Sequence, residues 1–317
     1  MSVVAQPTEA EICHELSALV PGRPIADLRV SEHAYRTSHW LAELEVLYRD
    51  GGVERLVLKD LSEGSLTDEA RRAKPACTID PAREIEVYRD VLHDAGLGTA
   101  AFRGGVIRPT DDRYWLFLEH LEGVELWQVG SLEVWCIVAN RLAELHAALA
   151  GAALGRPPLW SREYGSAWLE RAQEASGHEV LFHLAPRFGE IVDRLLRLPR
   201  GLVHGELFPS NVIVDVERER VSPIDWETAA VGPQLLDLAA LTAGRWTEGE
   251  RRTIALAYAE ASGRWADVEQ FLSDLDACRL HLAVQWLARS ASWTPPAEHA
   301  HDWLGEVETL ARRLNLL

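Results

Sequence analysis

The 317-residue sequence predicts an α+β protein of two lobes, a small N-terminal lobe with an antiparallel sheet and a larger, mainly helical C-terminal lobe. Before residue 122, strand patterns predominate, with one helix among them and no regular alternation of strand and helix. From residue 131 onward, apolar residues recur at helical spacing, interrupted only by residues 201–227. We place the boundary within residues 121–130 and expect lobes of residues 1–122 and 123–317.

The N-terminal lobe is predicted to contain five strands and one helix. Strand patterns occupy five segments: 25–30, 39–50, 53–61, 101–109 and 113–123. The third of these strands ends near Lys59. Residues 62–82 are polar and contain two prolines, which predicts a loop or insertion. The helix follows, with Asp80 as its N-cap, Pro81 in its first position and Gly96 at its end.

The C-terminal lobe is predicted to be helical around one polar loop. Helical spacing of apolar residues occurs in five segments: 132–151, 188–198, 250–262, 271–291 and 303–317. Between them, the stretch "GLVHGELFPSNVIVD" at 201–215 has the pattern of a strand, a polar loop and a second strand. The stretch "VSPIDWE" then adds a short strand that ends at Asp225.

Composition limits the classes of partner and the compartment. The formal net charge is −17, which argues against nucleic acid because phosphate backbones attract basic surfaces. The four cysteines are scattered without a CxxC pair, as in proteins of reducing compartments. The N-terminus has no basic start and no apolar core of a signal peptide, and no apolar run could span a bilayer. We therefore expect a soluble cytoplasmic protein without nucleic-acid or membrane partners, and its oligomeric state stays open.

Three polar residues stand at the ends of the short strands. Glu206, Asn211 and Asp225 offer two carboxylates and one amide, a set of hard oxygen ligands that suits Mg²⁺. A carboxylate close to the metal could also orient a hydroxyl nucleophile. Each residue alone has an ordinary structural explanation, since Asn is a common turn former and Asp a common helix cap. Their combination favours a metal-dependent reaction.

The same segment resembles the catalytic segment of the aminoglycoside phosphotransferase and choline kinase superfamily. That pattern is HGDxxxxN, then a hydrophobic-Asp-hydrophobic-Glu stretch, then GxxxxDLA. The matching residues in this chain are His204, Gly205, Asn211, Asp225, Trp226, Glu227, Gly232, Asp237 and Leu238. The resemblance covers roughly residues 25–290 and implies the two-lobed protein-kinase-like fold. It also implies a phosphotransferase that uses ATP or GTP and Mg²⁺ and acts on a hydroxyl group.

The resemblance assigns roles at the metal and the phosphates. It implies that Asn211 and Asp225 hold Mg²⁺, which neutralises the γ-phosphate in the transition state. Lys59 corresponds to the lysine that contacts the α- and β-phosphates, and Glu84 to its acidic partner on the following helix. Glu86 is the competing candidate for that partner, but Glu84 matches the family register better.

Further nucleotide contacts follow from the resemblance. The hinge at 119–123 contains Glu119 and Leu121, whose backbones are expected to hydrogen-bond adenine. The phosphate loop "SEHAYRTSH" lacks the glycines of protein kinases. Since the family tolerates Ser-containing loops here, the resemblance implies that Ser31, Tyr35 and Ser38 cover the phosphates.

The catalytic loop departs from the family at one position. Glu206 stands where the family has its catalytic Asp, and it extends the carboxylate by about 1.5 Å, one C–C bond. Two interpretations remain: a slow or inactive enzyme, or an acceptor hydroxyl placed one bond further back. His204 is expected to brace the loop and Asp237 to bond the loop backbone, while Trp226 takes the position of the Phe in a kinase DFG stretch.

The acceptor is predicted only by class. The C-terminal helices carry six tryptophans that we consider as acceptor contacts: Trp160, Trp168, Trp246, Trp286, Trp293 and Trp303. With acidic candidates at Glu206, Glu227 and Glu248, they favour an aminoglycoside-like or other amine-bearing hydroxyl compound. Three functions remain open: a small-molecule O-kinase, a Ser/Thr kinase of a natural-product peptide, and a nucleotide-binding regulatory protein weakened by Glu206.

Overall fold

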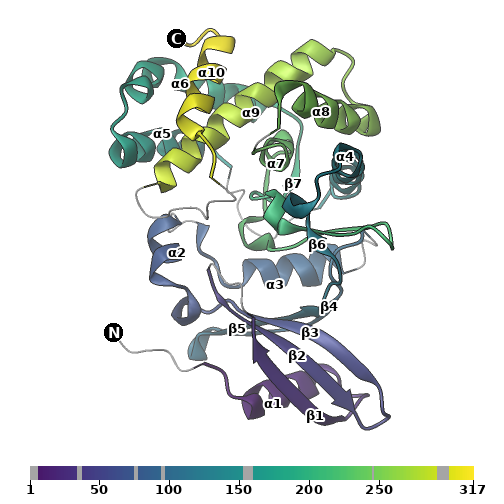
Figure 1. The fold of residues 1–317 in the computed structure, drawn as a ribbon. Helices are drawn as coiled ribbons and strands as arrows, with labels where there is room; N and C mark the ends of the chain where they lie inside the picture. The colour runs from purple at the N-terminus through teal and green to yellow at the C-terminus, as the bar shows by residue number, and fades with distance from the viewer. Residues whose placement is uncertain are drawn as a thin grey trace. The chain divides into compact units, whose positions relative to one another are not determined.

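The protein divides into two compact units, Met1–Glu122 and Gly123–Leu317 (Figure 1). The computed structural model describes residues 6–33, 38–74, 78–93, 97–152, 160–244, 246–290 and 300–317. The first unit contains one sheet and the second contains two small sheets, each with its own helices. The mixed architecture confirms the predicted fold class of an antiparallel sheet followed by a helical part.

A five-stranded antiparallel sheet forms the N-terminal unit, in the order β1-β2-β3-β5-β4. Its strands are β1 (Ile25–Glu32), β2 (Trp40–Tyr48), β3 (Val53–Asp60), β4 (Phe102–Arg108) and β5 (Arg113–Glu119). In β2, every second side chain from Trp40 to Tyr48 is buried, which is the pattern of a strand with one face on a core. All five strands correspond to strands predicted from the sequence.

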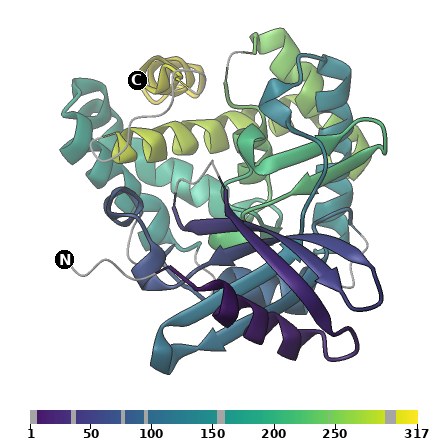
Figure 2. The same ribbon diagram turned by 60° about the horizontal axis from the view of Figure 1, so that its bottom comes forward.

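One face of this sheet is covered by α1 (Glu9–Leu19), which the sequence analysis did not predict. Figure 2 shows this helix, in purple, lying across the strands. Its Ile12 and Leu16 are fully buried in a core that includes Leu44 and Leu58 of the sheet. Thr8 and the third helical residue form a capping box, and the stretch "TEAE" is the local signal that could have predicted the helix.

The opposite face carries α3 (Arg83–Val87), which continues as a π-helical turn at Tyr88–Leu92. The predicted helix start was wrong, because Asp80 precedes the helix and accepts a hydrogen bond from the Ala82 amide instead of capping it. Residues 62–82 are also more structured than predicted. They contain the 3-10 turn η1 (Glu63–Ser65) and α2 (Asp68–Ala73), which Thr67 caps. The predicted helix end at Gly96 lies outside the described residues.

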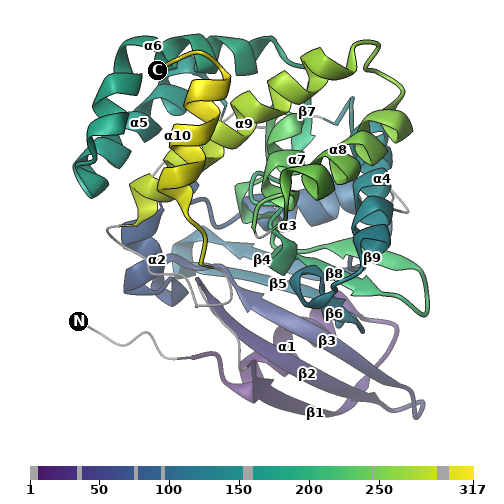
Figure 3. The ribbon, with the colours of Figure 1, turned by 45° about the horizontal axis from the view of Figure 1, so that its top comes forward.

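Helices and two small sheets make up the C-terminal unit. The helices are α4 (Leu132–Ala148), α5 (Arg162–Ser176), α6 (Glu179–Arg197), α7 (Leu235–Leu241), α8 (Glu248–Ser262), α9 (Val268–Arg289) and α10 (Trp303–Arg313). Figure 3 shows α9 between α5 and α6 on one side and α7 and α8 on the other. Within the described part of the chain, none of the helices is both long and apolar enough to cross a membrane.

The small sheets frame the polar loop found in the sequence. β6 (Val124–Glu125) pairs with β8 (Val212–Asp215), which pairs with β9 (Arg220–Pro223). The second sheet pairs β7 (Arg200–Val203) with β10 (Ala230–Pro233). The polar loop therefore runs from the end of one sheet to the start of the other, and residues 204–211 lie at that junction.

A cluster of charged residues fastens α10 to α9. The Glu306 carboxylate accepts a hydrogen bond from Arg279 at 2.6 Å and another from His301 at 3.3 Å. Arg279 also bonds Glu248 and Asp276. Burial raises the pKa of Glu306, but the bonds from His301 and Arg279 and the charge of Arg251 lower it by more, to about 2. The cluster thus depends on ionised Glu306.

This cluster predicts loss of stability in acid. Because the pKa of Glu306 is about 2 in the fold against 4.5 in the unfolded chain, its contribution is complete above pH 4.5 and disappears as pH falls toward 2. Glu306→Gln should lower the unfolding free energy at pH 7 by roughly 2–3 kcal/mol and flatten the loss below pH 4.5. Denaturant titrations at several pH values measure both effects.

Glu308→Gln is the matched control, since Glu308 lies on the same helix and pairs only loosely with the exposed Arg312 at 3.6 Å. It should change the unfolding free energy by less than about 0.5 kcal/mol. Equal effects of the two substitutions would contradict the role given to the Glu306 cluster.

Candidate active site

A buried carboxylate fixes the start of the loop between β7 and β8. Asp237 in α7 is 1% exposed, and its Oδ2 accepts from the His204 amide at 2.7 Å while its Oδ1 accepts from the Gly205 amide at 2.9 Å. His146 of α4 contacts Oδ2 at 3.1 Å. Two amides and an imidazole therefore satisfy this carboxylate, and the expected bond from Asp237 to the loop backbone is present.

His204 ties the loop to the segment that carries Asp225. Its Nε2 donates to the Ile224 carbonyl at 2.7 Å, so its Nδ1 is the acceptor for the Glu206 amide at 3.4 Å. The backbone at Gly205 has φ of +88°, and a Cβ there would lie 2.7 Å from the Thr228 carbonyl. This close approach requires glycine. The contacts of His204 are those of a bracing residue.

Asn211 and Asp225 extend from neighbouring points of the backbone. The Asn211 carbonyl accepts from the Ile224 amide at 2.9 Å, and Asp225 follows directly. Asp225 adopts a left-handed conformation with φ of 68° and ψ of 60°, which costs a non-glycine residue on the order of 1 kcal/mol. It lies two residues beyond β9, so the predicted strand end at Asp225 was slightly late. A strained residue at a fixed position is typical of functional sites.

The chemistry of this pair fits a magnesium ion held together with phosphates. Asn211 Nδ2 donates to the Glu206 carbonyl at 2.9 Å, so the amide is oriented and its oxygen is the atom that could bind a cation. Among the described residues, no group of three or more His, Cys, Asp or Glu side chains could hold a metal ion. Mg²⁺ usually binds one or two protein ligands and completes its shell with substrate phosphates and water. The pair therefore suits a metal that arrives with a nucleotide.

Glu206 pairs with a residue that the sequence analysis did not consider. Its Oε1 accepts a hydrogen bond from Nη2 of Arg289, the last residue of α9. The two side chains are 17% and 16% exposed. Burial lowers the pKa of Arg289, but the charge of Glu206, its hydrogen bond and the charge of Glu227 raise it by more, so the guanidinium is charged. The partners are 83 residues apart, and no local sequence pattern connects them.

The predicted phosphate lysine lies in the N-terminal unit with its predicted partner. Lys59 of β3 stands beside Leu41 and Leu116 of the flanking strands. Its Nζ lies 2.6 Å from Oε2 of Glu84, and the two side chains are 10% and 2% exposed. The register that favours Glu84 over Glu86 is therefore present in the structure. Buried carboxylates and ammonium groups are retained mainly where they are paired.

The other nucleotide candidates also lie in this unit, and their own contacts leave their roles as predictions. The Ser31 hydroxyl donates to the Glu43 carbonyl at 3.4 Å, and the Ser38 hydroxyl accepts from Lys74 at 2.9 Å. The Glu119 amide donates to the Ala101 carbonyl at 2.9 Å, so an adenine contact by Glu119 would use its carbonyl. Leu121 follows two residues after the end of β5, and Tyr35 lies outside the described residues.

Of the acceptor candidates, two tryptophans lie near the loop. Trp286 and Trp303 stack with ring centroids 5.3 Å apart, and Phe208 of the loop meets Trp286 edge-on at 5.1 Å. Trp160 and Trp168 are 5% and 1% exposed and act in packing.

The remaining acceptor candidates are not placed at the loop. Trp246 packs against Trp135 at 4.9 Å, and Trp293 lies outside the described residues. Glu248 lies in the α10 cluster, where Arg279 and Arg313 bind its carboxylate.

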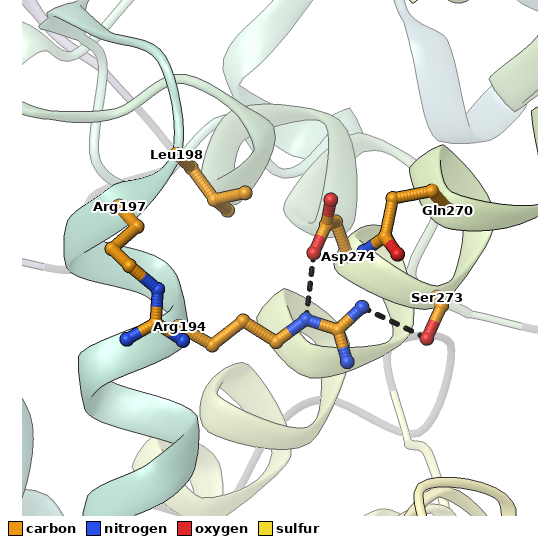
Figure 4. A pocket seen from close by; sticks show the side chains of 6 residues that line it. All are labelled: Arg194, Arg197, Leu198, Gln270, Ser273 and Asp274. Carbon is orange, nitrogen blue, oxygen red and sulfur yellow. Dashed lines mark hydrogen bonds and ion pairs between the residues drawn. The ribbon is translucent and has the colours of Figure 1, made fainter. Parts of the chain in front are cut away.

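A hollow of about 520 Å³ between α6 and α9 contains none of the predicted site residues (Figure 4). Six side chains line it: Arg194, Arg197, Leu198, Gln270, Ser273 and Asp274. The Arg194 guanidinium crosses it and donates to Asp274 at 2.6 Å and to Ser273 at 2.9 Å. These bonds join two helices, and we assign the hollow no part in the chemistry.

Comparison with solved structures shows the same fold in several kinases. An ethanolamine kinase of Plasmodium vivax has a TM-score of 0.60 at 13% identity, over 99% of this chain and 91% of its own. A choline kinase of Streptococcus pneumoniae has a TM-score of 0.60 at 15% identity, over 98% and 99%. An aminoglycoside phosphotransferase of Alicyclobacillus acidocaldarius has a TM-score of 0.58 at 15% identity, over 100% and 98%.

The sequence itself matches a family model. No curated protein matches it significantly in sequence. The model of the phosphotransferase enzyme family, however, matches residues 38–281, which include both the Lys59–Glu84 pair and the loop fixed by Asp237. The chain therefore belongs to the phosphotransferase enzyme family and is a small-molecule kinase that transfers phosphate to a hydroxyl group.

Proposed function

We propose that this enzyme moves the γ-phosphate of ATP or GTP, with Mg²⁺, to a hydroxyl of a small molecule. The observation that carries the proposal is the loop pinned by Asp237, which holds Asn211 beside the segment of Asp225 and presents the Glu206 carboxylate. The loop and the neighbouring segment of Asp225 thus offer two oxygen ligands for a metal and one carboxylate for a hydroxyl. Phosphoryl transfer requires these groups, since its catalysis consists mostly of positioning the reactants and stabilising charge.

In this proposal, each unit contributes residues with a separate role toward the nucleotide. Asn211 and Asp225 hold the metal, whose charge offsets that of the transferring phosphate when it is bound. Lys59, oriented by Glu84 at 2.6 Å, contacts the α- and β-phosphates. The backbones of Glu119 and Leu121 bind adenine, and Ser31 and Ser38 of the phosphate loop cover the phosphates.

Glu206 acts as the base. The acceptor oxygen attacks the γ-phosphorus, the bond to the leaving nucleoside diphosphate breaks, and the hydroxyl proton passes to the carboxylate. Arg289 occupies Oε1, and the structure gives Oε2 no partner among the described residues. Oε2 is therefore the atom that accepts from the hydroxyl. The longer reach of Glu compared with Asp matches a carboxylate that must satisfy Arg289 and the acceptor together.

The similar folds leave the identity of the acceptor open. Ethanolamine, choline and aminoglycosides, named for the kinases of similar fold, are amine-bearing hydroxyl compounds, the class that the tryptophans and acidic candidates of the C-terminal part favoured. Those proteins share no more than 15% identity with this chain, so their acceptors show the kind of molecule and not its identity.

The direct test is ADP release from ATP with and without Mg²⁺, across sugars, amino sugars, small alcohols and Ser-containing peptides. Acceptor-stimulated, Mg²⁺-dependent release with a small molecule supports the proposal. ADP release stimulated only by a peptide would show that the enzyme is a peptide kinase and not a small-molecule kinase. Tight nucleotide binding without transfer to any acceptor would favour a regulatory protein instead.

We predict that Asp225→Ala weakens the binding of MgATP at least tenfold, because the metal loses its only carboxylate ligand from the protein. Calorimetry with and without Mg²⁺ measures this directly, and the Mg²⁺ dependence of affinity should disappear in the variant. Asp215→Ala is the control, since that carboxylate ends β8 and bonds Arg218 at 2.7 Å. Unchanged MgATP binding in Asp225→Ala would refute the metal assignment.

We predict that Glu84→Gln weakens nucleotide binding or slows turnover by about tenfold or more, because Lys59 loses the carboxylate that orients it. Glu86→Gln should change either quantity less than about twofold. Lys59→Ala should reproduce or exceed the effect of Glu84→Gln. The reverse ranking of the two glutamates in steady-state kinetics would overturn the register on α3.

A further inference from the structure

Arg289 interacts with two kinds of group at once, a carboxylate and the faces of aromatic rings. Its guanidinium bonds the Glu206 carboxylate, and its Cζ lies 5.4 Å from the ring centre of Trp168 and 5.7 Å from that of Trp286. Both distances fall within the range of cation–π attraction. The buried Nε of Arg289 has no hydrogen-bond partner among the described residues. The protein therefore places a cation of its own beside the carboxylate that faces the acceptor hydroxyl.

An ammonium group on an acceptor would need the same partners. Proteins bind alkylammonium ligands with carboxylates and with the faces of aromatic rings. At this loop, the Glu206 charge is already neutralised, and two nearby indole rings are already in contact with a cation. A second cation next to the reacting hydroxyl would meet repulsion from Arg289, and a side chain 16% exposed is poorly screened by water.

We propose that Arg289 is a specificity-determining residue that makes the acceptor site select hydroxyl compounds without an ammonium group next to the reacting hydroxyl. The proposal rests on the proposed function, and it names the class of acceptor. It replaces the amine-bearing acceptor that the tryptophans and acidic candidates of the sequence favoured. In physiological salt the overall charge is screened within about 8 Å, so the nearest charged group determines the local preference.

The surroundings indicate what a neutral acceptor contacts. Phe208, Trp286 and Trp303 form a continuous group of half-buried rings next to the loop. Such surfaces favour a flat or apolar face of a ligand. We therefore expect an uncharged acceptor with a ring or an alkyl group beside its hydroxyl.

Two pairs of acceptors that differ mainly in charge test the proposal. The first pair is choline and its carbon isostere 3,3-dimethylbutan-1-ol. The second is 2-amino-2-phenylethanol and 2-phenylethanol, which share a hydroxyl and a ring and differ by one ammonium. ADP release with MgATP gives kcat/KM for each compound, and tryptophan fluorescence with a non-hydrolysable MgATP analogue gives the affinity. The wild-type enzyme should prefer the neutral member of each pair by about tenfold or more.

Three variants separate charge from shape and from packing. Arg289→Gln removes the charge and should shift the ratio about tenfold or more toward the cationic member. Arg289→Lys keeps a charge and should keep the preference for the neutral member. Arg171→Gln is the matched control, because Arg171 also lies over Trp168, at 5.5 Å, but does not bond Glu206. Its ratio should equal that of the wild type.

The outcomes distinguish this inference from the proposed function. A wild-type preference for the cationic members, an unchanged ratio in Arg289→Gln, or neither binding nor transfer with both neutral members overturns the role of Arg289. None of these results contradicts the proposed kinase activity if MgATP still binds and some other hydroxyl compound stimulates ADP release. Absence of MgATP binding in the wild-type enzyme refutes the proposed function itself.

Discussion

The buried carboxylate of Asp237 is the constraint on which the rest of the site depends. It accepts two successive backbone amides of the loop and contacts His146, whose Nδ1 meets the Tyr258 hydroxyl at 2.9 Å. A chain of bonds thus runs from α8 through α4 and α7 to the loop. Because a buried carboxylate is costly without its full set of partners, the loop backbone and the helical core require each other. The positions of Glu206 and Asn211 follow from that anchoring.

The net charge of the whole protein and the charges at the site favour different ligands. The net charge of −17 attracts cations from a distance, and it supplies no information about the groups at the loop. At the loop, a charged Arg289 neutralises Glu206 and contacts the neighbouring indole rings. The same ion pair offers a reason for the Glu in place of the family's Asp, since its carboxylate bonds the guanidinium with one oxygen and can receive a proton on the other.

Short-range sequence patterns predicted much of the fold and the site, and long-range contacts were the parts they missed. The five strands follow from the alternation of apolar and polar residues, whereas the resemblance to the kinase superfamily implied the pairing of Lys59 with Glu84 and the backbone bonds of Asp237. The helix α1 was missed although its capping box is visible in the sequence. Arg289 could not be predicted, because its pairing with Glu206 depends on how α9 packs, which no local pattern records.

The central claim is that the loop fixed by Asp237 presents Glu206 as the working base. Glu206→Gln tests it most directly, since the amide removes the charge with little change in shape and its oxygen can still accept from Arg289. General-base assistance contributes about 10²–10⁴-fold, so turnover with the best acceptor should fall by that factor while MgATP affinity stays within about twofold. Wild-type turnover in Glu206→Gln would contradict the account.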